Sequence, residues 1–131
     1  MDRTRFLLRT SAIYAFIGVM IGSHMAGSGD YVFRAIHAHI LVVGWLSLFS
    51  FAIFYRLFSI PASSVLAKIH VWTSFLGTFG LTVGMWLYYA NPIPNLATFN
   101  LLFFIIGGSV LFLGFFAFLL IAFVHGKHIH E

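Results

Sequence analysis

The chain has 131 residues, of which 61% are hydrophobic and only 8% are charged, and its mean hydropathy is +1.02. Soluble domains carry about 25% charged residues, so this composition predicts an integral membrane protein, folded as one bundle with no soluble domain. The lack of cysteine excludes disulfides, iron–sulfur clusters and covalently attached c-type haem. The formal net charge of +4 comes from a few Arg and Lys residues. We interpret it as a topology signal and expect no nucleic-acid partner.

Four apolar segments follow one another along the chain, and each is as long as the roughly 20 residues that cross a bilayer. They span about 6–25, 32–58, 65–89 and 97–124. The breaks between them contain Gly27 and Gly29, then Ser63 and Ser64 as possible helix caps, then the Pro-rich stretch 91–95. No alternating strand pattern is present, so we predict an all-α integral membrane protein, a single four-transmembrane-helix bundle over 1–131.

The basic residues predict how this bundle sits in the membrane. Six of them fall on one side of a four-helix bundle and only Arg34 falls on the other. The positive-inside rule then places both termini in the cytoplasm, which for a prokaryote means the inner membrane. Residues on the cytoplasmic side are Arg3, Arg5, Arg9, Arg56, Lys68 and Lys127.

Two histidines, His37 and His39, stand near the start of the second segment. Residues two positions apart on a helix point about 200° away from each other, so the imidazoles leave opposite sides of the helix. Buried polar groups need partners in a membrane. One possibility is a metal centre on each flank, for which haem iron fits best because imidazole is a common axial ligand. The alternative is that both rings hydrogen-bond to neighbouring helices or face the interface.

Other residues are candidates for contacts with such a cofactor. Arg34, one turn before His37, suits haem propionates, or it extends to the membrane surface. His24 would face headgroups, bind a propionate or act as an axial ligand. Gly44, about one turn past His39, lacks a side chain and so leaves room for a flat macrocycle, although simple helix packing explains glycine equally well. The tail residues His125, His128 and His130 could bind a metal or be solvated.

The stretch His37-Ala-His39-Ile-Leu-Val-Val-Gly44-Trp45 resembles the HxHxxxxGW pattern on the tenth helix of the catalytic subunit of haem-copper oxidases. Ala67-Lys68-Ile69-His70-Val71-Trp72 is similar to the opening of helix eleven in that subunit. The resemblance covers about 30–124 in order and spacing, so the chain looks like the last four helices, or one four-helix arc, of a twelve-helix protein.

The resemblance implies that His37 ligates the active-site haem and His39 the low-spin haem, and that His70 is structural. The family's three copper-binding histidines and its helix-two haem ligand have no counterpart here, so copper is not expected and the chain is not a complete oxidase. Because the family subunit has three equivalent arcs, we expect copies of this chain to assemble, as a trimer or alternatively a two-fold dimer, with haem b held between His39 of one copy and His37 of the next.

The expected function is therefore that of a small b-type cytochrome that transfers electrons, with quinol, a cytochrome or respiratory-complex subunits as partners. One alternative is a five-coordinate haem that senses or reduces O2 or NO. Another is a haem-carrying accessory subunit of a respiratory complex. Nucleophile–base catalysis and a carboxylate proton relay are not expected, because the only carboxylates, Asp2, Asp30 and Glu131, lie outside the apolar segments.

Overall fold

The computed structural model describes residues 2–128, and within them every regular element is helical. The prediction of an all-helical protein is therefore confirmed, and the helix ends lie within a few residues of the expected ones. The elements are α1 (Arg3–Ser28), α2 (Arg34–His39), the π-helix η1 (Ile40–Ser47), α3 (Leu48–Leu57), α4 (Val65–Met85), the π-helix η2 (Trp86–Ala90), the 3-10 turn η3 (Pro94–Leu96), α5 (Ala97–Val124) and the 3-10 turn η4 (Gly126–His128).

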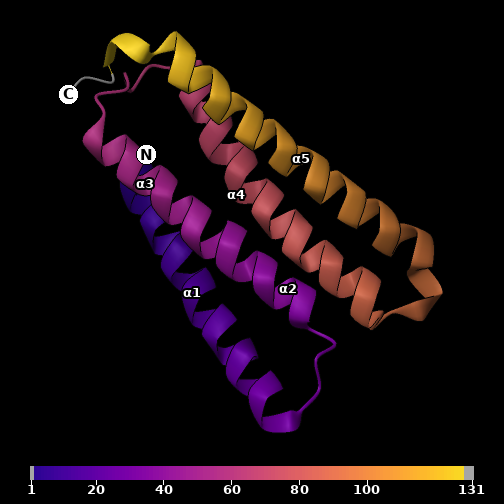
Figure 1. Ribbon diagram of the computed structural model, residues 1–131. Coiled ribbons are helices and arrows are strands. Elements are labelled where there is room, and N and C mark those ends of the chain that lie inside the picture. The colour runs from indigo at the N-terminus through magenta and orange to yellow at the C-terminus, as the bar shows by residue number, and fades with distance from the viewer. Residues whose placement is uncertain (1, 129–131) are drawn as a thin grey trace.

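The helices form two antiparallel hairpins (Figure 1). In the first hairpin, α1 packs against the continuous helix made of α2, η1 and α3. In the second, α4 packs against α5. The start of α1 and the end of α5 lie at the same end of the bundle (Figure 1), as two successive antiparallel hairpins require.

Glycine brings α4 and α5 into backbone contact. A Cβ atom added to Gly80 would come 2.8 Å from Cα of Gly107, and one added to Gly84 would come 2.5 Å from Cα of Phe104. One added to Gly114 would come 2.9 Å from the backbone nitrogen of Ser74. Small residues in a row let membrane helices approach this closely. These glycines therefore pack the second hairpin, as expected for most of them.

Aromatic rings join the two hairpins near the end of the bundle where α1 begins. The ring of Phe51 in α3 lies 4.5 Å from that of His70 in α4 and 4.7 Å from that of Phe118 in α5, centroid to centroid. Edge-to-face and tilted pairs of this kind stabilise beyond the area that they bury. At the same end, the Arg3 guanidinium donates to the carbonyl oxygens of Ile60 and Pro61, at 2.9 and 3.2 Å, which ties α1 to the loop before α4.

Within residues 2–128, three helices are long and apolar enough to cross a membrane: Arg3–Ser28, Arg34–Leu57 and Pro94–Val124. The protein thus has the character of a helical membrane protein. Helix α4 is not among the three, although it has 21 residues. Its polar residues explain why: His70, Ser74, Thr78 and Thr82 on the buried face and the exposed Lys68, together with several glycines, lower its hydropathy.

Of the two serines predicted as possible caps of α4, Ser64 is the one that caps it. The hydroxyl oxygen of Ser64 accepts a hydrogen bond of 3.2 Å from the backbone N–H of Ala67. This is the usual way to satisfy a donor in the first turn of a helix. Helix α1 ends at Ser28, and the next residue, Gly29, has a φ of 70°. Glycine adopts this left-handed conformation without strain.

Candidate histidine site

His37 and His39 lie on the α-helical turn that opens the second long helix, directly before a π-helical stretch. Helix α2 ends at His39, and η1 begins at Ile40. Because residues 34–39 have α-helical geometry, the two imidazoles diverge by about 200°, as the spacing predicted. π-Helical segments are rare and frequently lie at functional sites. The change of helix type therefore marks this turn as a place where packing departs from the regular pattern.

The His37 side chain is partly buried against α1. Its Nδ1 atom lies 2.9 Å from the carbonyl oxygen of Gly18. Since a carbonyl oxygen only accepts, Nδ1 carries the hydrogen and donates it. The ring also lies over Gly22, where an added Cβ atom would come 2.8 Å from Cε1. Gly18 and Gly22 are one turn apart on α1, so together they form the surface on which this imidazole packs. We call these two glycines the seat of His37.

The His39 ring is held within its own helix. Its Nδ1 atom lies 2.8 Å from the carbonyl oxygen of Ala35, one turn earlier. By the same argument Nδ1 is the donor. Among the described residues neither His37 nor His39 makes a second hydrogen bond. Both rings therefore present the lone pair of Nε2.

This arrangement suits metal ligation by a histidine. A ligating imidazole usually donates its other N–H to a carbonyl or carboxylate, which fixes the tautomer and the ring orientation. Within residues 2–128 no group of three or more His, Asp or Glu side chains lies close enough together to hold a metal ion. Haem iron needs only one or two axial ligands from the protein, because the porphyrin supplies the equatorial ones. Two separate imidazoles with free Nε2 atoms thus fit haem.

The other predicted contact residues lie apart from one another. His24 is exposed near the end of α1. Arg34 is exposed, with its guanidinium carbon 5.0 Å from the centre of the Tyr31 ring. Gly44 lies against the ring of Tyr14 in α1, which leaves no space there for a Cβ atom. Within one chain, then, helix packing accounts for Gly44, and a tyrosine fills the space that a macrocycle would take.

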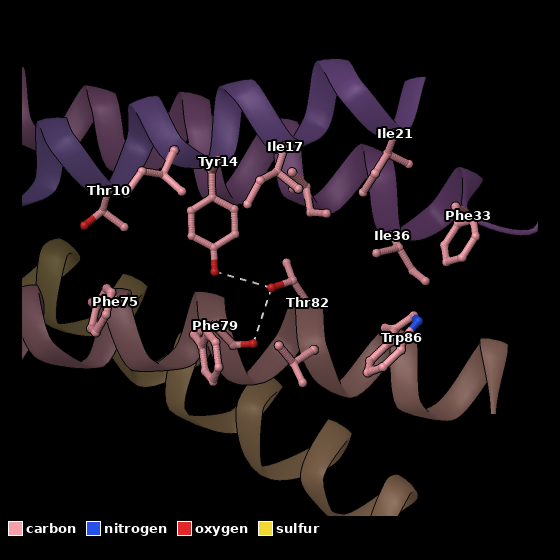
Figure 2. A pocket seen from close by; sticks show the side chains of 13 residues that line it. Thr10, Tyr14, Ile17, Ile21, Phe33, Ile36, Phe75, Phe79, Thr82 and Trp86 are labelled. Atoms are coloured by element: carbon pink, nitrogen blue, oxygen red, sulfur yellow. Dashed lines mark hydrogen bonds between the residues drawn. The ribbon is translucent and has the colours of Figure 1, made fainter. Parts of the chain in front are cut away.

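A cavity of about 590 Å³ separates α1 and α2 from α4, and Figure 2 shows the side chains that line it. Its lining is mostly apolar, and neither His37 nor His39 belongs to it. The Tyr14 hydroxyl of α1 points across it to Thr82 of α4, with 3.4 Å between the two oxygens (Figure 2). The lining residues are Thr10, Ile13, Tyr14, Ile17, Ile21, Phe33, Ile36, Ile40, Phe75, Phe79, Thr82, Val83 and Trp86.

His70, His125 and His128 occupy the opposite end of the bundle. His70 is fully buried, and its Nδ1 atom lies 2.7 Å from the Tyr55 hydroxyl. His125, just after α5, has its Nε2 atom 3.1 Å from the hydroxyl oxygen of Ser64. His128 belongs to the turn η4, and His130 lies outside the described residues.

Sequence reasoning did not find Gly18 and Gly22, which form the seat of His37. Their spacing of four residues in an apolar helix was a usable signal, because a small-xxx-small pair marks a close helix contact. Compared with known proteins, the chain matches no family model, no curated protein and no solved structure. The resemblance to the haem-copper oxidase subunit therefore rests on the motif residues alone.

Proposed function

We propose that this protein is a small membrane-embedded b-type haem protein, related to the catalytic subunit of haem-copper oxidases, that transfers electrons. His37 and His39 are its axial ligands. Haem b, when bound, supplies a one-electron redox centre, and the chain supplies ligation, burial and orientation. Quinol, a cytochrome or subunits of a respiratory complex are the partners with which such a centre would exchange electrons.

This proposal rests on one observation: both imidazoles make the same kind of hydrogen bond. Each Nδ1–H is bonded to a backbone carbonyl oxygen, at 2.9 Å for His37 and 2.8 Å for His39. In both rings Nε2 is thereby left as the basic nitrogen, and hydrogen bonding at Nδ1 raises its strength as a ligand. A free lone pair on an apolar helix needs a partner, and haem iron would supply one to each ring.

Ligation between copies follows from the divergence of the two rings. Because they leave the helix about 200° apart, they cannot approach one iron from the same chain. His39 of one copy and His37 of its neighbour can do so when the copies form a closed ring. A trimer matches the three equivalent arcs of the family subunit, and a two-fold dimer is the alternative. In either assembly every protomer uses both of its histidines.

The same proposal places α4 across the membrane as a fourth span. Helix α4 has 21 residues, close to the roughly 20 that a bilayer requires, and η2 continues it without a break. Its polar residues His70, Ser74, Thr78 and Thr82 are turned into the bundle, where they do not meet lipid. With four spans, the excess of basic residues at one end puts both termini in the cytoplasm of a prokaryote, and His37 and His39 near the outer face.

Absorption spectroscopy tests the proposal. The protein is purified in detergent from cells supplied with haem precursor, and spectra are recorded oxidised and reduced. We expect a Soret band and sharp α and β bands on reduction, typical of six-coordinate haem b. His37→Ala and His39→Ala should each remove or shift these bands.

His125→Gln is the matched control, because it changes a histidine at the far end of the bundle and should leave the spectrum unaltered. A colourless wild-type protein would refute the proposal. So would His37→Ala and His39→Ala variants whose spectra match that of the wild type.

A further inference from the structure

A row of polar side chains runs along the buried face of α4. His70, Ser74 and Thr78 each have no exposed area, and Thr82 is 5% exposed. Residues four apart on a helix lie on successive turns, about 6 Å apart along the axis. The row is continued at both ends by a tyrosine from the first hairpin: Tyr55 is 2.7 Å from His70, and Tyr14 is 3.4 Å from Thr82.

The middle of this row lacks hydrogen-bond partners. Among the described residues, Nε2 of His70, Oγ of Ser74 and Oγ1 of Thr78 are buried and bond to no other group. The Tyr55 hydroxyl is 2.7 Å from Nδ1 of His70 but 3.4 Å from the Ala67 carbonyl oxygen, so its proton goes to Nδ1. Nε2 of His70 then carries the ring hydrogen and is a buried donor.

Other hydroxyls of this chain behave differently. Those of Ser50, Thr73 and Ser109, on the outside of the bundle, each donate to the carbonyl oxygen four residues earlier, at 2.7 to 2.9 Å. A hydroxyl on a membrane helix usually satisfies itself in this way. Ser74 and Thr78 have the same local option and do not use it. Their hydroxyl groups are therefore available for partners within the bundle.

The spacing of the row indicates what those partners are. Two hydrogen bonds of 2.8 to 3.0 Å placed end to end cover roughly the 6 Å between successive turns. One water molecule between each pair of side chains would span this distance and give each unpaired atom a hydrogen-bond partner. Native proteins rarely leave buried polar groups without hydrogen-bond partners. Three such groups on successive turns of one helix therefore indicate a common partner.

We propose that His70, Ser74 and Thr78 bind a file of internal water molecules that joins Tyr55, at the end of the bundle where α1 begins, to the Tyr14–Thr82 pair at the cavity. The file is a proton path into the cavity. Its members donate and accept in turn once the Thr82 hydroxyl rotates away from the Thr78 carbonyl oxygen, to which it donates at 2.8 Å. A proton taken up from solvent at Tyr55 is then matched by one that the Tyr14 hydroxyl releases into the cavity. The apolar segments contain no carboxylate that could relay protons. The polar row on α4 would relay them instead. The proposal is independent of haem binding.

The test compares two double variants. Ser74→Ala/Thr78→Val removes both hydroxyls of the file, and Thr73→Val/Ser109→Ala removes two that already have carbonyl partners. Hydroxyl-radical labelling by X-ray radiolysis oxidises buried side chains that lie beside bound water. Phe51 is 4% exposed and its ring centre is 4.5 Å from that of His70. We expect Phe51 to be oxidised in the wild type and in the control pair, and several-fold less in the file variant.

The proton path has its own readout. On transfer to D2O, the infrared band of the Tyr14 hydroxyl, assigned by comparison with Tyr14→Phe, shifts as its hydrogen exchanges. We expect the file variant to lower the rate of this exchange on the order of tenfold, because water-bridged hydrogen bonds are lost. The control pair should exchange like the wild type. If Phe51 is not oxidised in the wild-type protein, the proposal of a water file is refuted, whether or not the variants fold. Labelled Phe51 with equal exchange rates in both variants overturns the proton path.

Discussion

The imidazole of His37 lies over Gly22, so closely that a Cβ atom on Gly22 would come 2.8 Å from Cε1 of the ring. That separation is shorter than carbon–carbon van der Waals contact, which is about 3.5 to 4.0 Å. Gly22 is therefore the residue whose missing side chain lets α1 accept the ring. A few residues further along, Gly27 has no atom within 4 Å of its Cβ position. The two glycines make a matched pair on one helix.

Gly22→Ala is expected to displace the His37 ring and to lower haem content several-fold, while Gly27→Ala leaves it unchanged. The added methyl group forces the imidazole away from the Gly18 carbonyl oxygen, to which Nδ1 now donates at 2.9 Å. Loss of such an outer partner typically reduces metal affinity by about 10- to 100-fold. The haem-to-protein ratio, from the pyridine haemochrome spectrum, measures the effect. Equal ratios in the two variants would show that the seat does not matter for ligation.

The main helices were predictable from the sequence because long apolar runs leave few alternatives in a membrane. The divergence of His37 and His39 was also predictable, since it depends only on helix geometry. A serine cap before the apolar run was predictable as well, although the sequence did not decide between Ser63 and Ser64, which is the cap. These features are local and are set by residues close together in the chain.

The features that the sequence did not reveal depend on contacts between distant segments. The carbonyl partner of His37 belongs to Gly18, 19 residues away. The packing of Tyr14 on Gly44 likewise joins α1 to η1. The apolar periodicity of the sequence does not predict the π-helical form of 40–47, which belongs to this packed pair of helices. The cavity, too, exists only because α1 and α4 meet at the Tyr14–Thr82 contact, leaving space beside it.

A second matched pair of glycines tests the packing of α4 on α5. Gly107→Ala places a methyl group against the backbone of Gly80, whereas at Gly108 the nearest atom is the flexible Leu81 Cδ1, 3.6 Å away. Overpacking against backbone typically destabilises by about 1 to 3 kcal/mol. We expect Gly107→Ala to lower the midpoint of SDS-induced unfolding, followed by circular dichroism, and Gly108→Ala to leave it nearly unchanged. Similar midpoints for both would mean that the two helices separate easily.

Carbon monoxide separates the two haem states considered above. With imidazoles on both faces of the iron no position is open, so the reduced wild-type protein should show no spectral change when CO is added. A shift of full size in the wild type would indicate a five-coordinate haem and favour gas sensing or reduction.

Co-expression of two inactive variants tests whether haem is shared between copies. A His37→Ala chain retains His39, and a His39→Ala chain retains His37. Each variant alone cannot complete a pair of axial ligands. Each mixed ring, with a His37→Ala copy beside a His39→Ala copy, holds one intact site, so material isolated through both tags should carry about a third of the wild-type haem as a trimer and about half as a dimer. The haem-to-protein ratio of the co-purified material, isolated through a different tag on each chain, measures the recovery.

The control is a mixture of the two variants purified separately and combined in detergent without exchange of subunits, which should remain colourless. Recovery only after co-expression requires that the two ligands come from different chains. This outcome follows from the divergence of the rings, because a helix that points His37 toward α1 turns His39 away from it. If both single variants keep haem when expressed alone, or if co-expression recovers none, ligation between copies is wrong. Native mass spectrometry of the recovered protein then distinguishes the trimer from the dimer.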